Sequence, residues 1–83
     1  MKHEDVMAAI DMQSDAGWIM ARVVCSTYRP EKFLFGLGEL GHLDEWNYQV
    51  AMSVIGYRRT PKWSDEVFFA LFKHAKQRLG VAS

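Results

Sequence analysis

Three clusters of turn-forming residues divide this 83-residue chain into short segments. They lie at residues 28–30, at Gly36, Gly38 and Gly41, and at residues 59–61. Glycine and proline interrupt regular structure at these points, so each intervening segment has room for only one or two helices or strands. A chain of this length forms one small core, and we therefore expect a single domain over residues 1–83.

The segment after the third cluster is predicted to form a helix that ends at Gly80. Thr60 can cap its start, and Pro61 suits the first helical position. Asp65 and Glu66 favour the positive end of the helix dipole, while basic residues gather near its negative end. One face is apolar and carries Val67, Phe68, Leu71, Phe72, Ala75 and Leu79.

The segment from His42 to Tyr57 is predicted to form a second helix. Its apolar side chains form two stripes, one of Leu43, Trp46, Val50, Val54 and Tyr57 and one of Tyr48, Ala51, Met52 and Ile55. Only a thin polar strip is left to face water. This pattern predicts a central helix that packs on two sides, with its aromatic side chains in the core.

The N-terminal third fits more than one arrangement. Apolar residues between 6 and 27 follow a 4,3 spacing that suits one long helix, but residues 14–17 could end one helix and cap another. Residues 18–28 are rich in β-branched and aromatic side chains, which also favours a strand. A lone strand has no evident partner, so we expect helix here, followed by a short helical turn from Pro30 to Phe35.

The segments together predict an all-α fold, a small compact bundle of four to five helices. An α+β fold with a short strand or hairpin around residues 18–28 is the alternative.

The charged residues are balanced overall but unevenly distributed. The chain contains ten Lys and Arg residues and ten Asp and Glu residues, so its formal net charge is zero. It therefore has no net electrostatic field that would attract nucleic acid or an anionic membrane. Residues 1–45 hold four basic and eight acidic side chains, and residues 46–83 hold six and two. We expect the two halves to pack together and neutralise each other, with self-association or a polar partner as alternatives.

The cysteine count and the N-terminal residues bear on the cellular compartment. Cys25 is the single cysteine, so no intramolecular disulfide can form, which favours a reducing environment. The N-terminal residues are acidic and lack the apolar region of a secretory signal, and no apolar run approaches 18 residues. We therefore expect a cytoplasmic protein without a membrane segment.

No pattern in the sequence predicts catalysis, a cofactor or a metal site. Residues 36–41 read G-x-G-x-x-G, but 83 residues cannot hold the strands of a dinucleotide-binding domain. His3, His42 and His74 lie far apart in the sequence, without the pairing that metal ligands show. Cys25 is expected to be a small buried hydrophobe rather than a nucleophile.

The remaining signal is an excess of aromatic residues beside a basic cluster. Arg58, Arg59 and Lys62 flank Trp63, and Phe69 falls among the charged positions of its helix, either packed locally over Lys73 or a neighbouring helix or exposed as an anchor. We predict an adaptor or inhibitor that covers a functional site on a larger protein, or a homodimer doing so, with contacts at Arg58, Arg59, Lys62, Trp63 and Phe69.

A small nucleic-acid-binding transcriptional regulator that uses residues 58–62 is the alternative function, because such a corner combines phosphate-binding cations with rings on which bases can stack. By analogy alone, short proteins without recognisable motifs are typical of accessory proteins of phages and other mobile elements.

Overall fold

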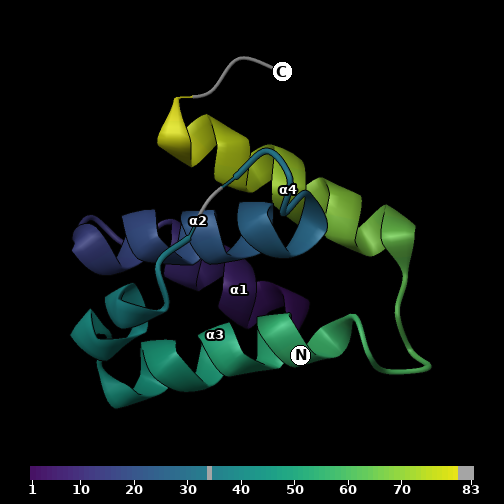
Figure 1. Ribbon diagram of the computed structural model, residues 1–83, viewed down its shortest axis with the longest axis horizontal. Coiled ribbons are helices and arrows are strands. Elements are labelled where there is room, and N and C mark those ends of the chain that lie inside the picture. Colours follow the sequence, from purple (N-terminus) through teal and green to yellow (C-terminus); the bar gives the residue numbers. More distant parts are fainter. Residues whose placement is uncertain (34, 81–83) are drawn as a thin grey trace.

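The computed structural model describes residues 1–33 and 35–80, and over these residues all regular secondary structure is helical, with turns and loops between the helices (Figure 1). The elements are α1 (His3–Ile10), α2 (Asp15–Tyr28), the 3-10 helix η1 (Leu37–His42), α3 (Glu45–Tyr57) and α4 (Asp65–Leu79). The prediction of an all-α bundle of four to five helices is confirmed. Residues 18–28 lie within α2, so the alternative strand is not formed.

The helix α2 lies at the centre of the bundle. It packs most extensively against α4 and also contacts α1, α3 and η1; Figure 1 shows α4 above it and α3 below. The core consists mainly of apolar side chains from the four α-helices, with Phe68, Ile10, Met20 and Leu71 among the largest that are fully buried. No helix of the described residues is both long and apolar enough to cross a bilayer.

The N-terminal third forms two helices rather than one. α1 ends at Ile10 and α2 begins at Asp15, with Gly17 donating its backbone N–H to the Ser14 carbonyl. A Cβ on Gly17 would lie 2.2 Å from the Met12 carbonyl oxygen and 2.9 Å from that of Ile10. The backbone can therefore turn this closely only because residue 17 has no side chain.

The described residues between α2 and α3 contain a turn and a 3-10 helix. A turn at residues 30–32 is closed by the Lys32 and Phe33 backbone N–H groups, which donate to the Arg29 carbonyl. The predicted helical turn to Phe35 includes Leu34, which lies outside the described residues. The glycine-rich segment forms the 3-10 helix η1, with Gly36 at its N-cap position.

The helix α3 starts at Glu45, three residues after the predicted boundary. The Asp44 carboxylate accepts a hydrogen bond from the Asn47 backbone N–H at 2.8 Å. Asn47 is fully buried, and its amide nitrogen also donates to the Asp44 carboxylate. His42 belongs to η1 rather than to α3, and Asp44 is the N-cap of α3.

The prediction that Thr60 and Pro61 start the last helix is wrong. The cap is Ser64, whose hydroxyl accepts from the Val67 backbone N–H, and α4 begins at Asp65. Thr60 instead donates its hydroxyl to the Tyr57 carbonyl, which keeps it in the loop. The predicted end is confirmed, because Gly80 adopts the left-handed conformation with a φ of 72°.

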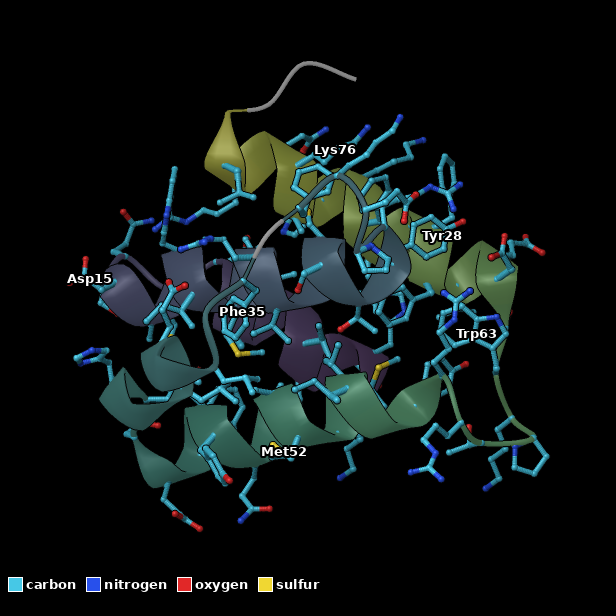
Figure 2. The ribbon with its side chains drawn as sticks, in the orientation of Figure 1. Asp15, Tyr28, Phe35, Met52, Trp63 and Lys76 are labelled. Atoms are coloured by element: carbon cyan, nitrogen blue, oxygen red, sulfur yellow. The ribbon has the colours of Figure 1, made fainter. Side chains whose placement is uncertain are left out.

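The prediction that α3 is a central helix packed on two sides is also wrong. It packs against α1 and α2, and its buried residues are Asn47, Val50, Ala51 and Val54. Its second apolar stripe faces outward, with Tyr48 39%, Met52 41% and Ile55 36% exposed. α3 is therefore an edge helix, and Figure 2 shows Met52 on the outer side of the bundle, away from α4.

Candidate partner-binding surface

The five predicted contact residues lie in the α3–α4 loop and on α4. Arg58, Arg59 and Lys62 are exposed, and Trp63 is half-buried at the end of the same loop. Phe69 lies in the second turn of α4 and is 44% exposed. The loop residues form one corner of the molecule, which we call the basic corner (Arg58, Arg59, Lys62 and Trp63).

The basic corner is held in place by aromatic packing. The Trp63 ring lies 4.8 Å from the Phe68 ring and 5.1 Å from the Tyr57 ring, measured between centroids. The Tyr57 hydroxyl donates to the Lys62 carbonyl at 2.9 Å and accepts from the Ser64 backbone N–H at 3.0 Å. Because both ends of this loop segment are fixed, its cations are presented on an ordered backbone.

Phe69 is partly packed against its neighbours and partly exposed, so both of the environments predicted from the sequence apply in part. Its ring centroid lies 6.1 Å from Tyr28 and 6.3 Å from Phe72, and the Lys73 ammonium lies 5.6 Å from it. One side of the ring is thus packed locally, while nearly half of the residue stays accessible.

Tyr28 is buried and packs against Phe69 and against Phe68, whose ring also contacts Trp63 of the basic corner. Its hydroxyl donates to the Asp65 carboxylate at 3.2 Å, and the Arg29 guanidinium lies 4.6 Å from its ring. Burial raises the pKa of the Tyr28 hydroxyl, Asp65 raises it further, and the charges of Arg29 and Arg58 oppose the rise. Figure 2 shows Tyr28 and Trp63 on the same side of the molecule.

Sequence reasoning missed Tyr28, since it falls at a break between segments and its neighbours come from distant parts of the chain. Contacts through the buried rings of Tyr28 and Phe68 link Phe69, Asp65 and the basic corner. We call Phe69, Asp65 and the basic corner, with Tyr28 beneath them, the aromatic–basic surface.

The cations of this surface have not been neutralised by the acidic half of the chain. Within residues 1–33 and 35–80, Arg58, Arg59 and Lys62 form no ion pair. The pairs that do form over these residues are Arg22 with Glu39, both in the acidic half, and His74 with Asp11, which joins the two halves. The expected mutual neutralisation therefore does not extend to the basic corner.

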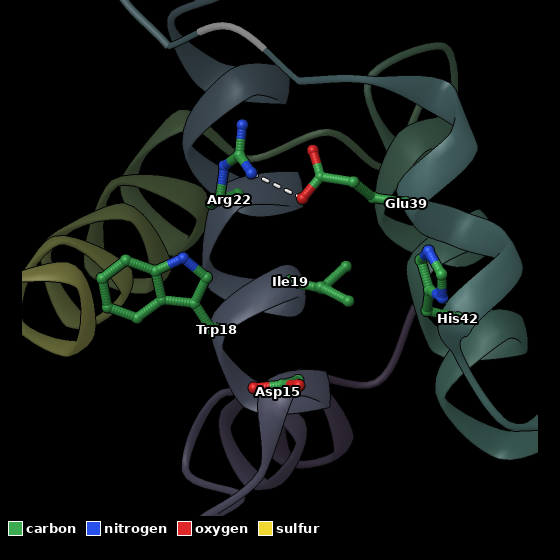
Figure 3. A pocket seen from close by; sticks show the side chains of 6 residues that line it. All are labelled: Asp15, Trp18, Ile19, Arg22, Glu39 and His42. Atoms are coloured by element: carbon green, nitrogen blue, oxygen red, sulfur yellow. Dashed lines mark hydrogen bonds and ion pairs between the residues drawn. The ribbon is translucent and has the colours of Figure 1, made fainter.

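A cleft of about 640 Å³ lies on another side of the molecule, between α2 and η1. Figure 3 shows its lining residues, which are Asp15, Trp18, Ile19, Arg22, Glu39 and His42. Arg22 and Glu39 bind each other at 2.5 Å across it. Over the described ranges, no group of three or more His, Cys, Asp and Glu side chains could hold a metal ion.

The candidate nucleophile of the chain lies in the core. Cys25 is fully buried in α2, and burial raises the pKa of its thiol to about 11. The thiolate, which is the reactive form, is therefore disfavoured at neutral pH. Of the histidines considered as metal ligands, His74 forms a hydrogen bond with the Asp11 carboxylate at 2.6 Å.

The chain matches no protein-family model, no curated protein and no solved structure.

Proposed function

We propose that this protein is a protein-binding module, an adaptor or inhibitor that covers a functional site on a larger protein. The observation that carries the proposal is that the partly exposed Phe69 ring and the Arg58–Trp63 pair, 5.0 Å apart, are both held by the same buried rings, Tyr28 and Phe68. Aromatic residues and arginine are the types that dominate binding energy at protein interfaces.

The chemistry of this surface defines the partner. The exposed cations would pair with acidic side chains of the partner, and the accessible part of Phe69 would enter an apolar pocket of the partner. One side of an ordinary interface covers about 800 Å², which is a modest part of the 5249 Å² surface of this chain. We infer an acidic partner surface that surrounds an apolar depression.

Ring geometry favours a protein partner over nucleic acid. Proteins that bind single strands offer aromatic faces on which bases stack. Here Arg29, Arg58 and Lys73 lie over Tyr28, Trp63 and Phe69 respectively, so one face of each ring is already occupied by a cation.

Capture of the partner from a lysate of the native cell tests the proposal, with the lysate split into nuclease-treated and untreated halves. The unmodified protein should retain a stoichiometric protein from both halves. Arg58→Glu should lose it, while Lys2→Glu changes the net charge equally and should keep it, because Lys2 lies beside Trp46 and Gln49 of α3. Recovery that disappears with nuclease would favour the nucleic-acid-binding alternative and overturn the proposal.

A second variant tests the anchor. Phe69→Ala should leave the fold intact and weaken partner binding, since the ring is 44% exposed. If this change unfolds the domain, Phe69 belongs to the core and is not an anchor. The cytoplasmic location and an accessory role in a mobile element are also part of this proposal. The single cysteine, which excludes an intramolecular disulfide, supports the former.

A further inference from the structure

The outer face of α3 carries a stripe with heptad spacing. Glu45, Tyr48, Met52, Ile55 and Arg59 follow one another at intervals of 3, 4, 3 and 4 residues. Arg59 lies just beyond the helix, but its backbone N–H still donates to the Gly56 carbonyl at 3.1 Å, so the chain keeps a helix-like turn to this point. Spacing of this kind places all five side chains along the seam that a helix presents to a partner helix.

The three central residues of the stripe are apolar and have no partner helix in the bundle. Tyr48, Met52 and Ile55 are each 36–41% exposed, which is unusual for three large apolar side chains in one row. The stripe therefore has the composition of an interface rather than that of a solvated helix face.

The two ends of the stripe carry opposite charges. Glu45 lies seven residues before Met52, and Arg59 lies seven residues after it. Neither forms an ion pair within the described residues, although Glu45 accepts a hydrogen bond from Gln49 on its own helix. A second α3 in antiparallel orientation would bring each Glu45 to the Arg59 of the other copy and would also oppose the helix dipoles.

We propose that two copies of this chain associate through α3, antiparallel across a two-fold axis near Met52. The charges select this occupant and this orientation, because a parallel pair would place Glu45 against Glu45 and Arg59 against Arg59. Association through α3 goes beyond the proposed function. It leaves Arg58, Trp63 and Phe69 outside the seam, while Arg59 belongs to both the seam and the basic corner.

The short seam predicts a small interface and a weak association. A helix of 13 residues is about 20 Å long at 1.5 Å per residue, so the interface falls at the small end of the range for specific complexes. We expect a dissociation constant of about 10–100 μM, typical of a weak complex of this size.

Charge exchange between the two ends of α3 tests the proposal on the purified full-length chain. Sedimentation equilibrium up to about 500 μM should show a dimer for the unmodified protein, at a concentration well above the expected dissociation constant. Glu45→Arg and Arg59→Glu should each weaken the dimer about tenfold, because each creates two like-charge contacts across the axis. The double variant should recover affinity to within about threefold, since the reversed pairs attract again.

Apolar substitutions supply an independent readout with a matched control. Ile55→Glu should abolish the dimer, while Leu37→Glu, at a side chain that is 77% exposed on η1, should not change it. Circular dichroism of each variant monitors folding, and the charge exchange decides the matter if Ile55→Glu does not fold. A monomer at the highest concentration, or a double variant weaker than both single variants, would overturn the proposal.

These measurements contain no other protein, so they can fail while the aromatic–basic surface still binds its partner. Conversely, Arg58→Glu can abolish partner capture while the dimer persists. A dimer that is unaffected by Ile55→Glu would show that the copies meet elsewhere, which would also overturn the proposal.

Discussion

The helices α2 and α3 are both rich in apolar residues, yet they occupy different positions in the fold. α2 is enclosed by α1, α3, α4 and η1, whereas α3 packs against α1 and α2 and leaves a stripe outside. The difference lies in the size of the side chains. α2 carries Gly17, Ala21 and Cys25 at four-residue intervals, all buried, and such small residues let neighbouring elements approach closely. Apolar content alone therefore does not identify the central helix.

The glycines of the two helices give the largest predicted contrast. Gly17→Ala should lower the free energy of unfolding by about 3–5 kcal/mol, because its Cβ would meet backbone carbonyls that cannot move aside independently. Gly56→Ala should instead raise it by about 0.5–1 kcal/mol, since no atom lies within 4 Å of that Cβ. Urea denaturation measures both. A Gly17→Ala protein as stable as the unmodified chain would show that Gly17 does not lie in close contact with the Met12 and Ile10 carbonyls.

The methionines of the two helices give a smaller contrast. Met20→Ala should lower the free energy of unfolding by about 3 kcal/mol, because Met20 is fully buried and the change leaves a cavity. Met52→Ala should lower it by less than about 1 kcal/mol at low protein concentration. Equal losses for the two variants, in thermal or urea unfolding, would contradict the assignment of α3 as an edge helix.

The buried thiol of α2 gives a pH dependence. The pKa of Cys25 is about 11 in the folded protein, above its ordinary value of 9.0. The folded state therefore favours the protonated thiol more strongly than the unfolded state does. The resulting contribution to the free energy of unfolding is fully present below pH 9 and is lost as the pH rises towards 11. The loss should reach about 2–3 kcal/mol. Cys25→Ala should flatten the stability profile between these pH values; an unchanged profile would mean that the thiol is not responsible.

Local signals in the sequence predicted most of the helices. The carboxylates at the start of α4 and Gly80 at its end act through contacts within one or two turns, which a sequence pattern can reveal. The start of α4 could not be located in this way, because Tyr57 fixes the loop through hydrogen bonds to Lys62 and Ser64 that no local rule anticipates.

The candidate surface was partly predictable for the same reason. Arg58, Arg59, Lys62 and Trp63 are neighbours in the sequence, so their cluster is visible before folding. Tyr28 joins them only through the tertiary packing of α2 against α4. The free stripe of α3 was also missed, because a helix with two apolar stripes does not reveal which of them will find a partner within the chain.

Oxidation of the methionines in the unmodified protein tests the central contrast most directly. Mild peroxide treatment converts accessible methionine to its sulfoxide, and tandem mass spectrometry resolves each site. At low protein concentration Met52 should oxidise at least about tenfold faster than Met20, because its thioether is accessible and that of Met20 is not. Protection of Met52 equal to that of Met20 under these conditions would place the outer stripe of α3 inside the fold and contradict the account.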